Sequence, residues 1–131
     1  MRDEATAAVM TEAAERDTVT AVTLPGPEER TLDPDQVWAV AGHMIDDEDR
    51  QPPRFPAHAE PRVTSAIRLI FERHGLGPRS LVVTSAARGT DIIAAEQALA
   101  LGAHVWLLIP LPEQTFITIS VALPGTTWAT R

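Results

Sequence analysis

Residues 81–102, LVVTSAARGTDIIAAEQALALG, join an apolar run, a turn of small residues and an Ala-rich stretch that closes on a glycine. The apolar run predicts a buried strand, because it offers no polar face to water. The Ala-rich stretch predicts a helix from 92 to 101 that presents Ile92, Ala95 and Leu99 to the core. A strand that leads straight into a helix is the repeating unit of parallel α/β sheets.

The same alternation extends to both sides of this stretch. Residues 37–41 (VWAVA) and 105–109 (VWLLI) are continuous apolar runs, each typical of a strand buried on both faces. Between the first of these runs and residue 81, apolar residues recur at spacings of three and four after Pro61 and stop near Gly75, which predicts a helix. We therefore expect an α/β fold with a parallel sheet of three to four strands, right-handed crossovers and helices on both faces.

The end of the chain has two interpretations. Residues 115–121 (TFITISV) alternate apolar and polar side chains, which is the periodicity of a strand. A doubly wound unit would instead place a helix after its third strand. The residues by themselves leave both open.

The first 36 residues differ in composition from the rest of the chain. They hold three of the 11 Arg residues and nine of the 18 acidic residues, so most of the net charge of −7 belongs to them. A short helix is predicted within 3–16 and an edge strand within 18–24. We therefore divide the chain into an acidic N-terminal segment, residues 1–36, and a ligand-binding domain, residues 37–131.

Composition excludes several classes of protein. The 131 residues contain no Cys, which excludes a disulfide framework, a thiolate zinc site and a cysteine nucleophile. No apolar run approaches the roughly 18 residues of a membrane helix, and the acidic start is unlike a signal peptide, so we expect a cytoplasmic protein with no membrane partner. The chain has no Lys and its Arg residues are scattered, which disfavours binding of duplex nucleic acid but permits one anionic ligand.

The turn at 85–91 has the properties of an anion site. Ligands of open α/β sheets bind beyond the carboxyl ends of the strands, and the first N–H groups of a helix lack partners. Small side chains would let a ligand approach the backbone, and a glycine would permit the tight turn. A guanidinium would hold a phosphate, and hydroxyl groups would donate hydrogen bonds to it. A carboxylate would face a sugar or base. The residues given these roles are Ser85, Ala86, Arg88, Gly89, Thr90 and Asp91. An ordinary strand–helix turn with a cap is the alternative, since GxGxxG is absent.

Two further segments could contribute to the same site. Gly42 and His43 follow the first predicted strand, and Arg54 lies in a Pro-rich loop that could fold over an anion. A structural role is the alternative for His43. The acidic run at 46–49 lacks the alternating ligands of a calcium loop, so we expect a solvated loop, no metal and no cofactor.

Several of these residues also occur together in known proteins. They are Thr84–Asp91 with Ala94–Glu96 and Leu101–Ala103, and Gly42–Asp46 with Arg54–Pro56. Over residues 37–128 the chain resembles the Rossmann-like superfamily that unites DNA-processing protein A (Smf) with the Lonely Guy proteins, in a bacterial branch associated with signalling modules. The resemblance implies a Rossmann-like fold that binds a nucleotide or nucleotide-derived ligand, often as a sensor, and it favours a helix at 115–121.

The same resemblance bears on catalysis. Lonely Guy phosphoribohydrolases carry Gly-Gly-x-Gly-Thr-x-x-Glu. Gly89 and Thr90 match the Gly-Thr pair, but Ile93 stands where the catalytic Glu would be. The leading hypothesis is therefore a nucleotide-binding sensor domain without assigned catalytic residues.

Two other functions remain as alternatives. One is a nucleotide N-glycosidase or phosphoribohydrolase that uses Asp91 or Glu96 with His43. The other is an interaction module without a ligand. Because three strands bury little, we also expect a homodimer or a partner domain that covers the sheet or the tail at 115–123.

Overall fold

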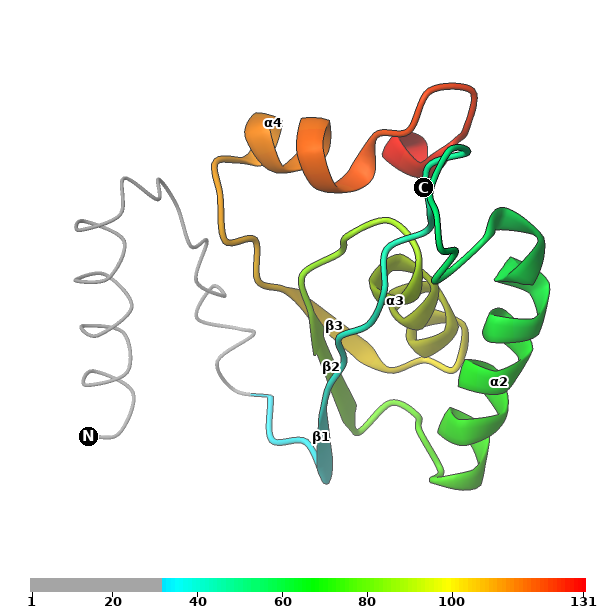
Figure 1. Cartoon of the computed structure of the whole chain (residues 1–131). Helices are drawn as coiled ribbons and strands as arrows, with labels where there is room; N and C mark the ends of the chain where they lie inside the picture. Colours follow the sequence, from blue (N-terminus) through cyan, green and yellow to red (C-terminus); the bar gives the residue numbers. More distant parts are fainter. Residues whose placement is uncertain (1–31) are drawn as a thin grey trace.

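The computed structural model describes residues 32–131, which contain a parallel sheet of three strands (Figure 1). The strands are β1 (Gln36–Ala39), β2 (Ser80–Thr84) and β3 (His104–Leu107), in the order β1-β2-β3. Trp38, Val82 and Val105 stand side by side in the register. The expected α/β fold with a parallel sheet is confirmed, whereas the helix and strand expected before residue 25 lie outside the described residues.

Two helices connect the strands. α2 (Glu60–Arg73) has a proline in its first turn and follows a 3₁₀ turn, η2 (Ala57–Ala59). The chain leaves α2 through Gly75 at φ 67°, where the Leu76 N–H donates to the Phe71 carbonyl at 3.0 Å. α3 (Thr90–Ala100) starts directly after the turn that follows β2. Both helices therefore begin and end within a few residues of the expected positions.

α2 and α3 pack against each other on one face of the sheet (Figure 1). On that face the Trp38 ring meets the Phe71 ring edge-on at 5.8 Å between centroids. Val82 and Ala94 are fully buried between the layers. The expectation of helices on both faces is therefore wrong for residues 32–131. The physical reason is the strand order, because crossovers of one hand place their helices on one side unless the order reverses.

The inner face of α3 also differs from the expected stripe. Leu99 is 59% exposed, whereas Ile93, Ala94 and Ala98 are completely buried. α3 lies between the sheet and α2, and its start also contacts the C-terminal segment. A helix buried on several sides does not follow the simple amphipathic pattern of a surface helix.

The C-terminal segment is helical where the residues allowed two interpretations. α4 (Glu113–Phe116) continues into a π-helical turn, η3 (Ile117–Val121), and a 3₁₀ turn, η4 (Trp128–Thr130), follows. The helix favoured at 115–121 is confirmed. Side chains of this segment join the loop after β1 and the start of α3 in one apolar cluster: Ile45, Phe55, Ile92, Ile93, Phe116, Val121 and Trp128.

Among residues 32–131, every helix is too short or too polar to cross a lipid bilayer.

Candidate functional site

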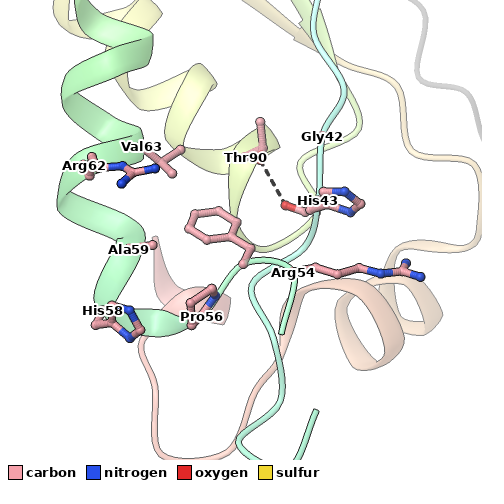
Figure 2. Close-up of a pocket in the computed structure, with 10 residues that line it drawn as sticks. Gly42, His43, Arg54, Pro56, His58, Ala59, Arg62, Val63 and Thr90 are labelled. Atoms are coloured by element: carbon pink, nitrogen blue, oxygen red, sulfur yellow. Dashed lines mark hydrogen bonds between the residues drawn. The ribbon is translucent and has the colours of Figure 1, made fainter. Parts of the chain in front are cut away.

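A cleft of about 600 Å³ opens beyond the carboxyl end of β1 (Figure 2). Its walls are the chain after β1, the loop at 54–56, the beginning of α2 and the first residue of α3. This is the place where open α/β sheets hold their ligands. The described residues that line the cleft are Gly42, His43, Arg54, Phe55, Pro56, His58, Ala59, Arg62, Val63 and Thr90.

Basic side chains dominate the polar part of this lining. Figure 2 shows His43 and Arg54 on one wall, while His58 and Arg62 come from η2 and α2 on the other. None of the described lining residues carries a carboxylate. The cleft therefore concentrates positive charge within a chain whose formal net charge is −7.

Hydrogen bonds to one carbonyl join the chain after β1 to the first residue of α3. The His43 carbonyl accepts both the backbone N–H of Thr90, at 3.2 Å, and the Thr90 hydroxyl, at 3.0 Å. The hydroxyl bond is drawn in Figure 2. The start of α3 thereby fixes the backbone at His43, which places that imidazole beside the cleft.

The loop that carries Arg54 is fixed by the carboxylate of Asp46. Its Oδ2 accepts the backbone N–H groups of Arg54 and Phe55, both at 2.8 Å, and the Asp46 N–H donates to the Phe55 carbonyl at 2.8 Å. The acidic run at 46–49, expected to be solvated, thus begins with a residue that shapes the cleft. A second hollow of about 320 Å³ shares Gly42, His43 and Arg54 with the cleft and has acidic as well as basic walls.

Two N–H groups of the turn at 85–91, which we expected from the sequence to be free for an anion, are bonded within the chain. Thr90 N–H is bonded to the His43 carbonyl, and Arg88 N–H donates to the Ser120 carbonyl at 2.8 Å. Gly89 forms an antiparallel bridge with Met44. These polar groups are taken by carbonyls of the same chain, because the loop after β1 and the C-terminal segment pack directly against the turn.

Gly89 is a glycine because of this close packing. Its φ is 99°, and a Cβ there would lie 2.6 Å from the Ile45 nitrogen and 2.9 Å from the His43 oxygen. The expected tight turn is therefore present, but the space that the missing side chain leaves is filled by the chain itself.

Arg88 differs most from its expected role. Its side chain is buried, and its guanidinium donates to the Ile45 carbonyl at 3.2 Å, the Ala122 carbonyl at 3.2 Å and the Asp47 carboxylate at 3.0 Å. A guanidinium with three partners in the protein connects the loop after β1 to the C-terminal segment. The structure thus corrects the role of a free phosphate-holding group.

Asp91 and Ser85 are engaged with each other. The Ser85 hydroxyl donates to Asp91 Oδ2 at 2.5 Å, and Asp91 is 4% exposed. Asp91 Oδ1 and the Thr84 hydroxyl are buried without a hydrogen-bond partner among the described residues. Asp91 is therefore a buried group beneath the turn, and the structure does not place it where it could face a sugar in the cleft.

The predicted site residues fall into two groups. Gly42, His43, Arg54 and Thr90 come together in the lining of the cleft. Ser85, Ala86, Gly89 and Asp91 do not line it and belong to the turn, while Arg88 lines only the second hollow. Sequence reasoning missed His58 and Arg62. His58 precedes Pro61, where the predicted helix opens, so no helical spacing in the sequence related the two residues.

The carboxylates considered for hydrolysis are not next to His43 in the cleft. Asp91 is bonded to Ser85, and both Glu96 oxygens accept from Arg131, at 2.8 and 2.6 Å. The contact with Glu96, followed by that with Glu60, raises the pKa of Arg131. The geometry therefore offers a basic cleft without an acidic partner for His43 among the described lining residues.

No family model, no curated protein and no solved structure matches the chain.

Proposed function

We propose that this protein binds a nucleotide or nucleotide-derived small molecule, with the phosphate held in the basic cleft, as a Rossmann-like sensor domain. One observation carries the proposal. His43, Arg54, His58 and Arg62 come from separate segments and line one cleft whose described lining includes no carboxylate. The charge of the cleft is therefore opposite in sign to the formal net charge of the chain, which is −7.

The chemistry of the basic groups supports a phosphate rather than an unspecified anion. A guanidinium presents a planar fork of N–H donors that matches two phosphate oxygens, and an imidazole can donate one further hydrogen bond. Arg54 and Arg62 stand on different walls, and the Arg54 side chain extends away from Arg62 in Figure 2, so Arg54 would have to turn towards the cleft for both to hold one phosphate. The Thr90 hydroxyl, already bonded to His43, belongs to the same lining.

The size and the apolar part of the cleft support a ligand larger than phosphate. Its volume of about 600 Å³ lies within the range of small-molecule sites, roughly 300–1,000 Å³. Pro56, Ala59 and Val63 add an apolar wall beside the basic side chains. A base or ribose can cover that wall while the phosphate meets the guanidinium groups, which is the division of labour expected of a nucleotide site.

Calorimetric titration with nucleoside monophosphates, nucleoside diphosphates, cyclic nucleotides and inorganic phosphate tests the proposal. We expect at least one nucleotide to bind below millimolar and more tightly than inorganic phosphate. Arg54→Ala and Arg62→Ala should each weaken it about tenfold or more, because each removes a charge-assisted hydrogen bond of roughly 1.5–3 kcal/mol.

Arg73→Ala provides the matched control. Arg73 is an exposed residue of the same helix as Arg62, with the same charge, but it does not line the cleft. Its removal should leave the affinity within about twofold. The proposal fails if no member of the panel binds, or if the Arg73 variant loses as much affinity as the Arg62 variant.

A further inference from the structure

The second hollow adjoins the basic cleft and shares part of its wall. Its volume is about 320 Å³, and Gly42, His43 and Arg54 line both it and the cleft. No side chain stands at Gly42, where an added Cβ would lie 2.4 Å from Cγ2 of Thr90. The two spaces therefore meet along a short stretch of the chain after β1, so that one ligand of nucleotide size can occupy both.

The arginines around these two spaces divide into two groups. The side chain of Arg54 extends away from Arg62 and lies on the same side as His43 (Figure 2). In the lining of the second hollow, Arg54 is joined by Arg50 and Arg88. Arg62, on the opposite wall of the cleft, does not line the second hollow. Arg54 is therefore placed to serve the second hollow, while Arg62 serves the cleft.

The two carboxylates that line the second hollow are already engaged. Asp46 Oδ2 accepts two backbone N–H groups, and Asp46 Oδ1 lies 3.4 Å from Nε of Arg50. Asp47 Oδ1 accepts from the buried guanidinium of Arg88 at 3.0 Å. Arg54 has no carboxylate partner in the described part of the chain, so one guanidinium of the lining is in excess. This excess of positive charge favours an anionic group in the second hollow.

We propose that the ligand is a nucleoside bisphosphate, with one phosphate in the cleft beside Arg62 and the other in the second hollow beside Arg50 and Arg54. This inference rests on the proposed nucleotide site and narrows the class of its ligand. A single phosphate would require Arg54 to turn towards the cleft, whereas two phosphates separated by a ribose match the arginines in their present directions. The second phosphate adds charge-assisted hydrogen bonds of its own, because each guanidinium presents a fork of donors.

Calorimetric titration of the full chain with 5′-monophosphates, 5′-diphosphates and 3′,5′-bisphosphates of adenosine and guanosine tests the inference. The diphosphate and the bisphosphate carry a similar charge, but only the bisphosphate has the ribose between its phosphates. In at least one series we expect one bisphosphate per chain, bound at least tenfold more tightly than the monophosphate or the diphosphate. Arg50→Ala should bring the bisphosphate down to the affinity of the monophosphate, because the second phosphate loses a donor.

Arg68→Ala is the matched control for Arg50→Ala. The Arg68 side chain is 37% exposed and pairs with Glu72 four residues away, much as the Arg50 side chain is 39% exposed and pairs with Asp46. Arg68 lines neither the cleft nor the second hollow. Its removal should leave the affinity for the bisphosphate within about twofold, because salt screens a charge that does not touch the ligand. Melting curves verify that each variant is folded.

The possible results separate failure of this inference from failure of the proposed function. A bisphosphate that binds no more tightly than the diphosphate, or two bisphosphates per chain, would overturn the inference while the nucleotide site stands. Arg50→Ala losses that are equal for the monophosphate and the bisphosphate, or no greater than those of Arg68→Ala, would overturn it in the same way. If no nucleotide binds at all, the proposed function fails, and this inference fails with it.

Discussion

At the scale of single residues, Gly89 sets how closely the loop after β1 approaches α3. Its backbone conformation, φ 99° and ψ −127°, is one that residues with a side chain rarely adopt. The atoms that a Cβ would meet belong to the backbone of Ile45 and His43, which cannot rotate away. The identity of this residue therefore controls the position of His43 in the cleft.

Gly89→Ala is expected to lower the free energy of unfolding by about 3 kcal/mol or more, because it adds backbone strain of roughly 1–3 kcal/mol to a close contact. Gly125→Ala is the control, since Gly125 has φ 77° but open space around its Cβ position. It should cost only about 1–2 kcal/mol, the price of the left-handed conformation. Urea denaturation of both variants measures the difference, and equal losses would mean that the close approach at Gly89 is of no consequence.

Arg88 is the second residue whose side chain holds distant segments together. We expect Arg88→Ala to reduce the free energy of unfolding by about 2–4 kcal/mol, because the carbonyls of Ile45 and Ala122 lose their buried donor. Arg88→Lys should restore little, since an ammonium lacks the fork that reaches several oxygens.

Arg50→Ala is the matched control for Arg88. Arg50 meets Asp46 at 3.4 Å with its own side chain 39% exposed, and such pairs contribute about 0–1 kcal/mol. Guanidinium denaturation should show a small loss for the Arg50 variant and a large one for Arg88→Ala. A loss below about 1 kcal/mol for Arg88→Ala would contradict the structural role.

At the scale of elements, Arg131 fastens the C-terminal segment to both helices. Its guanidinium bonds to Glu96 of α3 and to Glu60 of α2, and it lies 4.1 Å from the centre of the Trp128 ring. The Arg131 side chain is 25% exposed, so its two ion pairs are less screened than those at an open surface. The three contacts act on one side chain and connect three elements.

Arg131→Ala should lower the free energy of unfolding by about 1–2 kcal/mol, through loss of the networked ion pairs and the contact with Trp128. Arg68→Ala removes an exposed pair with Glu72 on α2 and should cost only about 0.3–0.5 kcal/mol. Thermal melting of both variants checks this. Hydrogen exchange should also quicken at η4 in the Arg131 variant alone, and unchanged exchange there would argue against the fastening role.

At the scale of the whole molecule, the charge of the cleft is opposite to that of the chain. With a formal net charge of −7, in which His is counted as neutral, the protein as a whole repels an anionic ligand, while Arg54 and Arg62 attract it at short range. The arginines of the cleft are exposed, so dissolved salt screens this attraction within about 8–10 Å at physiological ionic strength.

We therefore expect the affinity for a nucleotide to fall severalfold between 50 and 500 mM sodium chloride, measured by calorimetry. The slope of log affinity against log salt should be smaller for Arg54→Ala than for the natural chain, since one screened charge is gone. The slope for Arg73→Ala should be unchanged. An affinity independent of salt would mean that the ligand is held by apolar contacts instead of the basic cleft.

The sequence by itself determined the succession of strands and helices along the chain and the residue near which α2 ends. Those features depend on neighbours in the chain: apolar runs such as 81–84, the periodicity after Pro61 and the turn at Gly75. It also indicated part of the cleft, since the ends of strands carry ligands in this class of fold, and Gly42, His43, Arg54 and Thr90 do line it.

Only the tertiary structure decided which groups are free and which are engaged. Arg88 and Asp91 look like ligand-binding residues by type, but their partners are 43, 41, 34 and 6 residues away in the chain, where no local pattern reveals them. Leu99 fits an apolar stripe yet is exposed, because α3 is buried by elements from both ends of the domain. Hydrogen bonding and burial are settled by contacts distant in sequence, whereas periodicity reports only the backbone's local conformation.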